Sequence, residues 1–108
     1  MKVISLFSGC GGLDLGFEKA GFEIPIANEF DKTIWETFKV NHPKTKLIEG
    51  DIGQVDFNSI PKTPFIIGGF PCQGISLAGP RKLDDKRNIL YRYFVKLVEE
   101  NQPHTFVA

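Results

Sequence analysis

The sequence predicts an α/β fold with a parallel sheet and flanking helices, on two observations. Short apolar segments, such as residues 3–8 and Phe65–Gly68, alternate along the chain with segments whose apolar residues recur at helical spacing. The first of these apolar segments is continuous and bounded by glycine, as in a strand buried on both faces. Strands that alternate with helices are typical of a parallel α/β sheet.

Length and composition limit the classes of protein that remain. The chain has 108 residues, which allows at most one domain, and 42% hydrophobic with 24% charged residues is ordinary for a soluble globular protein. Thirteen basic and 13 acidic residues cancel, which argues against a protein that coats nucleic acid, although a local basic patch can still bind phosphates. Two cysteines without a CxxC pair indicate neither a disulfide framework nor a metal site. We expect a cytosolic protein with no targeting or membrane-spanning segment.

The first predicted strand, residues 3–8, is followed by a glycine turn and then by a helix. This helix begins at Leu13, carries Leu13, Phe17 and Ala20 on its apolar face, and ends at Gly21. A second strand, residues 24–27, leads to Asp31, a good N-cap residue. The helix that Asp31 begins is expected to stop at Pro43 and to bury Ile34, Trp35 and Phe38.

The remaining elements follow the same alternation. Lys46–Glu49 and Phe65–Gly68 are the third and fourth predicted strands, and residues 104–108 begin a fifth. Between the last two lie a polar loop, residues 77–87, and a helix. The apolar stripe of that helix comprises Leu90, Phe94, Leu97 and Val98, with Tyr91, Arg92 and Tyr93 elsewhere on its surface. Both histidines, His42 and His104, are expected to be structural.

Three segments at strand ends point to a cofactor that carries adenosine. The glycines of Phe-Ser-Gly-Cys-Gly-Gly, residues 7–12, permit close approach of a ligand to the backbone at a helix N-terminus. Glu29 lies about twenty residues beyond Gly9, where an acidic side chain accepts hydrogen bonds from ribose hydroxyls. Asp51 could bond the adenine amino group, with Phe30 and Ile52 on the two sides of the base. A turn without a ligand is the alternative.

A cysteine follows the fourth strand in Gly-Gly-Phe-Pro-Cys-Gln, residues 68–73. Glycines loosen this turn and proline stiffens it, so that Cys72 is either a nucleophile held over a cleft or a small buried apolar residue. A nicotinamide-dependent dehydrogenase does not generally need such a thiol. Methyl transfer to an unactivated ring carbon does need covalent assistance, which favours a methyltransferase.

Four segments, residues 7–13, 28–31, 50–52 and 69–73, in this order and spacing, resemble the N-terminal portion of cytosine-C5 DNA methyltransferases. The resemblance implies a Rossmann-like S-adenosylmethionine-dependent methyltransferase fold. Residues 1–108 would form the N-terminal part of the catalytic domain, without its target-recognition region. The resemblance also implies a cytoplasmic enzyme of a prokaryotic cell that acts on double-stranded DNA in restriction-modification.

The resemblance assigns roles to individual residues. Cys72 is the implied catalytic nucleophile, which adds to a cytosine flipped out of the duplex. The implied contacts with S-adenosylmethionine are Phe7, Gly9, Cys10, Gly11, Gly12, Leu13, Glu29, Phe30, Asp51, Ile52, Pro71 and Leu90. The implied DNA contacts are Gln73, Ser76, Arg81 and Arg87, and no residue is assigned to a metal.

The family's catalytic glutamate belongs to a Glu-Asn-Val motif that follows a segment like residues 103–108. We therefore expect the 108 residues alone to be inactive and a C-terminal methyltransferase fragment to complement them. Two alternatives stay open: a fragment of an NAD-dependent oxidoreductase, and a catalytically silent module for cofactor binding or assembly.

Overall fold

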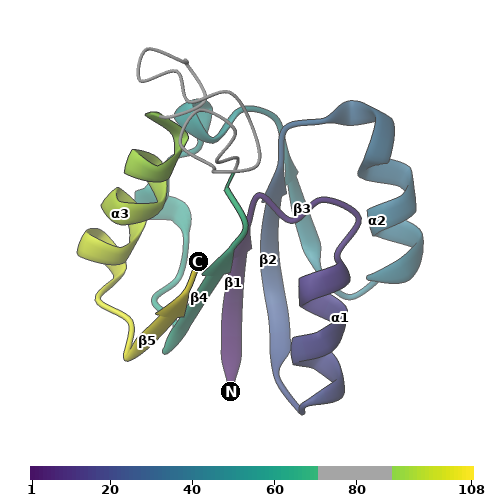
Figure 1. Ribbon diagram of the computed structural model, residues 1–108, viewed down its shortest axis with the longest axis horizontal. Coiled ribbons are helices and arrows are strands. Elements are labelled where there is room, and N and C mark those ends of the chain that lie inside the picture. Colours follow the sequence, from purple (N-terminus) through teal and green to yellow (C-terminus); the bar gives the residue numbers. More distant parts are fainter. Residues whose placement is uncertain (71–88) are drawn as a thin grey trace, which may run out of the picture.

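The structure, a computed structural model, describes residues 1–70 and 89–108. Its strands form one parallel sheet in the order β3-β2-β1-β4-β5 (Figure 1). The five strands are β1 (Lys2–Leu6), β2 (Glu23–Glu29), β3 (Lys46–Glu49), β4 (Phe65–Gly68) and β5 (Thr105–Val107). The predicted parallel α/β fold is therefore confirmed, and the bounds of β3 and β4 match the predicted ones.

Helices cover both faces of this sheet. α1 and α2 lie on one side of it and α3 on the other (Figure 1). Alternate residues of β1 face the two sides of the sheet: Val3 is in one cluster with Phe17 of α1, whereas Ile4 and Leu6 are in the other with residues of α3. The helices are α1 (Gly12–Lys19), α2 (Trp35–Asn41) and α3 (Leu90–Asn101), with 3₁₀ turns η1 (Lys32–Ile34), η2 (Ile52–Gln54) and η3 (Phe57–Ser59).

Several element boundaries differ from the predicted ones, among them those of β2, which spans Glu23–Glu29, and two of the differences have local reasons. β1 ends at Leu6 because Phe7 leaves the extended conformation with φ of 53°. Asp31 is an N-cap as predicted, and its side chain accepts a bond of 2.9 Å from the Thr33 amide. The element that it caps is the 3₁₀ turn η1, so that α2 starts only at Trp35.

The predicted apolar face of α1 is correct at Phe17, which packs on the core beside Val3, but wrong at Leu13 and Ala20. Leu13 and Ala20 are exposed, and the buried residue of this helix is Asp14, which lies against Ser5 of β1. The inward-facing set is Asp14, Phe17 and Glu18, at the helical spacings of three and four. Gly21, with φ of 96°, follows the helix end as expected.

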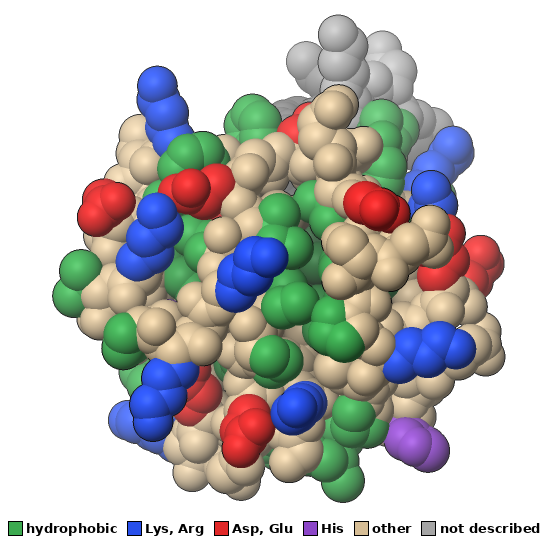
Figure 2. All heavy atoms as spheres, turned by 180° about the vertical axis from the view of Figure 1, so that it is seen from behind, with side chains coloured by type: hydrophobic (Ala, Val, Ile, Leu, Met, Phe, Trp, Pro, Cys, Tyr) green, Lys and Arg blue, Asp and Glu red, His purple; other side chains and the backbone are tan. Residues whose placement is uncertain are grey.

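α3 buries its predicted stripe, since Phe94 and Leu97 are inaccessible and Leu90 and Val98 are half-buried against the same core. Tyr93 also packs there, although it was expected outside the stripe. No helix among residues 1–70 and 89–108 has the length and apolar character needed to cross a membrane. On the face in Figure 2, basic and acidic side chains are interspersed, in keeping with the balanced charge of the sequence.

Candidate cofactor pocket

A cavity of about 690 Å³ opens at the carboxyl-terminal edge of the sheet. The order of the strands reverses between β1 and β4, and ligands of open α/β sheets bind at such a switch point. The volume lies within the usual range for small-molecule sites. Its lining residues are Phe7, Gly9, Asn28, Glu29, Phe30, Asp51, Ile52, Gly69, Ile89, Leu90 and Tyr93.

The loop after β1 has an unusual backbone. Phe7, Gly9 and Gly11 have φ angles of 53°, 58° and 89°. A non-glycine residue such as Phe7 adopts a positive φ at a cost of about 1–3 kcal/mol, and such strain is found most often at functional sites. The Gly11 amide closes the loop by a bond of 3.0 Å to the Ser8 carbonyl oxygen. The loop therefore presents the Gly9 backbone to the cavity in a fixed conformation.

Glu29, the last residue of β2, is held from several directions. Its two carboxylate oxygens accept bonds of 2.8 Å each from the amides of Gly9 and Asp31. Its carbonyl oxygen accepts bonds from the Trp35 indole, at 2.9 Å, and from the Gly50 amide, at 3.1 Å. Because each carboxylate oxygen has a further lone pair, this oriented side chain can still accept bonds from ligand hydroxyls.

Other residues that line the cavity combine a carboxylate, that of Asp51, with the apolar side chains of Phe30 and Ile52. Asp51 caps η2, since one of its carboxylate oxygens accepts a bond of 2.8 Å from the Gly53 amide. Ile52 is buried in the core, whereas the Phe30 ring is 70% exposed. Tyr93 lies so close to this turn that a Cβ at position 53 would be 3.1 Å from its hydroxyl oxygen.

Buried Asn28 supports the cavity floor and was missed by the sequence analysis. Its side-chain amide donates bonds of 2.7 Å to the Ile48 carbonyl and 3.1 Å to the Gly50 carbonyl, and these bonds tie the end of β2 to β3. Tyr93, Ile89 and Gly69 were also missed. The signal for Tyr93 was its position three residues after Leu90, on the same helix face.

The residues predicted to contact the cofactor or the DNA, together with the predicted nucleophile, fall into three groups. Those that line the cavity are Phe7, Gly9, Glu29, Phe30, Asp51, Ile52 and Leu90. Those that continue the loop into α1 without lining it are Cys10, Gly11, Gly12 and Leu13; the side chains of Cys10 and Leu13 are exposed. Those outside the described residues are Pro71, Cys72, Gln73, Ser76, Arg81 and Arg87.

This set of groups fits an adenosine-bearing cofactor. An oriented carboxylate suits ribose hydroxyls, a second carboxylate lies near the apolar residues Phe30 and Ile52, and the cavity is large enough for a nucleoside. A glycine loop after β1 and an acidic residue at the end of β2 are typical of the α/β class whose members bind nucleotide cofactors.

Within that class, residues 1–108 match the family described as C-5 cytosine-specific DNA methylase, and the chain belongs to this family. It is 60% identical, along its whole length, to the type II methyltransferase M.NgoPII of Neisseria gonorrhoeae, of which it covers 32%. The chain thus spans about a third of the length of such curated relatives.

Solved structures agree with this assignment. A protein described as a DNA modification methyltransferase encoded within a prophage of Escherichia coli superimposes with a TM-score of 0.81 and 39% identity. The match covers 98% of this chain and 30% of that protein. A TehB-like SAM-dependent methyltransferase from Corynebacterium glutamicum matches 63% of this chain and 36% of its own, with a TM-score of 0.53 and 20% identity. The predicted Rossmann-like methyltransferase fold is confirmed.

Proposed function

We propose that the chain is the N-terminal part of the catalytic domain of a DNA (cytosine-5-)-methyltransferase, which methylates C5 of a flipped cytosine in double-stranded DNA. The observation that carries this proposal is the cavity at the sheet edge. It collects Gly9, Glu29, Asp51 and Leu90 from four separate segments into one site that fits an adenosine. Family membership supplies the reaction class.

The residues of the cavity would hold S-adenosylmethionine. Glu29 would accept bonds from the ribose hydroxyls, Asp51 would accept one from the adenine amino group, and Phe30 and Ile52 would flank the base. The carboxylate of Glu29 is already oriented by the Gly9 amide, so little ordering would accompany binding. The bound cofactor supplies an electrophilic methyl group on a sulfonium.

Cys72 would be the nucleophile. Addition of its thiolate to C6 of cytosine moves electron density to C5 and makes that carbon nucleophilic. C5 would then take the methyl group of the sulfonium, whose carbon–sulfur bond breaks to leave the thioether S-adenosylhomocysteine. Loss of the C5 proton and of the Cys72 thiolate would restore the aromatic ring. Gln73, Ser76, Arg81 and Arg87 would contact the DNA and offset the few kcal/mol needed to flip the base. The relatives named type II methyltransferases favour a role in restriction-modification, with a C-terminal segment that completes the site.

Calorimetric titration of the 108-residue chain with S-adenosylhomocysteine and, separately, with NAD tests the cofactor. We expect heat of binding only with S-adenosylhomocysteine, and binding should weaken at least about tenfold in Glu29→Ala because its oriented acceptor is lost. Preference for NAD would favour the oxidoreductase alternative instead.

Covalent trapping tests the reaction. The chain, mixed with the C-terminal two thirds of a relative and with cofactor, is incubated with duplex DNA that contains 5-fluorocytosine, and denaturing electrophoresis detects the adduct. We expect an adduct with the native chain and none with Cys72→Ser. An adduct that persists in Cys72→Ser would exclude Cys72 as nucleophile, and absence of any adduct would favour a silent binding module.

A further inference from the structure

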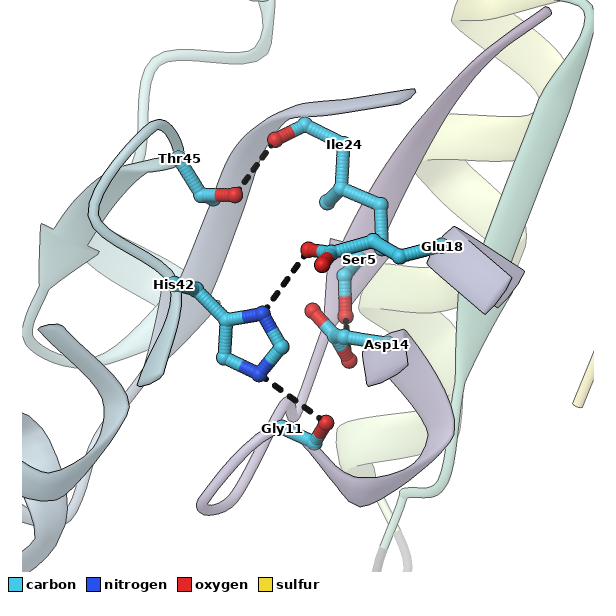
Figure 3. Close-up of polar contacts among 7 residues, drawn as sticks. All are labelled: Ser5, Gly11, Asp14, Glu18, Ile24, His42 and Thr45. Carbon is cyan, nitrogen blue, oxygen red and sulfur yellow. Dashed lines mark hydrogen bonds and ion pairs between the residues drawn. The ribbon is translucent and has the colours of Figure 1, made fainter. Parts of the chain in front are cut away.

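His42, at the C-terminal end of α2, is buried beside the glycine loop, with 3% of its surface exposed. Its Nδ1 lies 2.8 Å from a carboxylate oxygen of Glu18, and its Nε2 lies 3.1 Å from the Gly11 carbonyl oxygen (Figure 3). The ring stacks on Phe38, with centroids 4.7 Å apart. The imidazole therefore joins α1, α2 and the loop that precedes α1.

Both partners of the ring are acceptors of hydrogen bonds. A neutral imidazole carries one N–H and could satisfy only one of them, whereas an imidazolium carries two. The alternative, a bare ring nitrogen against a carbonyl or carboxylate oxygen in a buried site, is electrostatically unfavourable. The geometry is fully satisfied when each ring nitrogen donates, one to Glu18 and one to Gly11.

We infer that His42 is a positioning residue of the cofactor pocket: as a doubly protonated imidazolium, it fixes the Gly11 carbonyl against Glu18 and so holds the loop that presents Gly9 to Glu29. This inference rests on the proposed function only in naming the ligand. It concerns a residue that does not line the cavity.

The ring and the loop are in direct contact. A Cβ at Gly11 would overlap the imidazole of His42, so the two groups cannot move independently. Gly11 closes the loop onto Ser8 through its amide and accepts from His42 through its carbonyl. Gly9 lies in the chain between Ser8 and Gly11, and its amide donates a hydrogen bond to Glu29. Loss of the imidazole bond would release one side of this loop.

The charged groups around His42 come from several elements. α1 contributes Asp14 and Glu18, which converge on the ring in Figure 3. The adjoining cavity of about 680 Å³ adds Lys2 from β1, Glu23 from β2 and Lys44 from the segment after α2. Burial raises the pKa of Asp14 and favours its neutral form. Glu18 is then the carboxylate that pairs with the ring.

Nitrogen-15 NMR of the imidazole tests the proton count without any cofactor. We expect His42 to show two protonated nitrogens at neutral pH, while the exposed His104 serves as internal control. Hydrogen exchange of the Gly9 amide gives the second readout, and it should become at least about tenfold faster in His42→Leu. A single protonated nitrogen, or unchanged Gly9 exchange in a folded variant, would overturn the inference.

Glu18→Gln distinguishes the effect of the second imidazole proton from the effect of the packing of the His42 ring. A glutamine amide can donate to Nδ1, so that a neutral ring still donates from Nε2 to Gly11. In Glu18→Gln the imidazole should therefore show one protonated nitrogen, while the Gly9 amide keeps its native protection from exchange.

Thr45→Val is the matched control, because the Thr45 hydroxyl donates to Ile24 at 2.6 Å nearby without touching the loop. It should keep both imidazole protons and the native hydrogen exchange of Gly9. The same number of imidazole protons in the native chain and in Glu18→Gln would refute the role of the imidazolium. No binding of S-adenosylhomocysteine at any pH would count against the proposed function, while Gly9 exchange would still decide the role of His42.

Discussion

The two faces of the sheet are built from different chemistry. Under α3 the buried residues are mainly apolar, with Ile4, Leu6 and Ile66 packed on Phe94 and Leu97; the buried polar residue of this helix is Asn101, at its end. Toward α1 and α2 the described residues include a buried polar set, namely Ser5, Asp14 and His42. Apolar burial is non-directional and stabilises the fold, whereas each polar group needs a partner in a defined place. The polar face is also the one that adjoins the glycine loop, which suggests a division between stability and positioning.

The largest effect is expected on the apolar face. Leu97→Ala removes a side chain with 0% exposure and should lower the free energy of unfolding by about 2–5 kcal/mol, since a cavity is left in the core. Urea denaturation measures this loss. The imidazole NMR signals of His42 should be unchanged in the folded variant. A loss below about 1 kcal/mol would mean that this face is not the main source of stability.

Gly11→Ala should have the next largest effect, on the polar face. The new Cβ would overlap the His42 ring, and alanine is strained at a φ of 89°. We expect a loss of about 2–3 kcal/mol in unfolding free energy, together with faster hydrogen exchange at Gly9.

Gly16→Ala in α1 is the matched control for that substitution. Nothing lies within 4 Å of its added Cβ, so it should be neutral or stabilise the chain by about 0.5–1 kcal/mol. Equal losses for the two substitutions would show that helix propensity, and not the contact with His42, decides the outcome at Gly11.

The apolar face was readily predicted from the sequence. Phe65–Gly68 and the stripe from Leu90 to Val98 are strong patterns, because a continuous apolar run or an apolar stripe at helical spacing favours burial of those residues. The buried polar set of Ser5, Asp14 and His42 was not predicted. A carboxylate in the first turn of a helix is ordinarily solvated, where it interacts favourably with the helix dipole. Asp14 is buried only because Ser5, nine residues earlier, offers a hydroxyl at 2.8 Å. Such pairing is a tertiary property.

The candidate site was predicted in the same uneven way. Glu29 and Asp51 stand at strand ends, and the parallel order of strands brings them to one edge. The bond from the Gly9 amide to Glu29 could not be deduced, because it depends on the positive φ angles of the loop. His42 was expected to be structural, and its burial agrees, but its contact with Gly11 required the structure.

Glu29→Gln tests the residue at the end of β2 that lines the cofactor pocket. Both carboxylate oxygens of Glu29 face backbone N–H donors, and an amide can satisfy only one of them. We expect a loss of about 1–2 kcal/mol in unfolding free energy. Affinity for S-adenosylhomocysteine should also fall about tenfold in calorimetry. Glu36→Gln, at an exposed site of α2, is the control and should change neither quantity. Unchanged affinity in Glu29→Gln would remove the carboxylate from the proposed site.

The smallest effect, about 1 kcal/mol, is expected for Asp14→Asn. In the native chain Ser5 donates to one oxygen of Asp14, and the other has no partner among the described residues. Burial raises the pKa of this carboxyl above its ordinary value of 3.8, so the folded state binds its proton more tightly than the unfolded state does. The native chain therefore loses stability as the pH rises from about 3.8 through the raised pKa, whereas the asparagine variant does not.

Urea denaturation of both proteins across this pH range gives the difference directly, because the other carboxyl groups titrate alike in each. Asp14→Asn should be the more stable protein at neutral pH, and the advantage should vanish in acid. The opposite result at neutral pH, with the native chain more stable, would mean that the attraction between a charged Asp14 and His42 outweighs the burial of the carboxylate. The imidazolium would then be shared between Asp14 and Glu18, and Glu18→Gln alone would no longer suffice to remove the second proton from the ring.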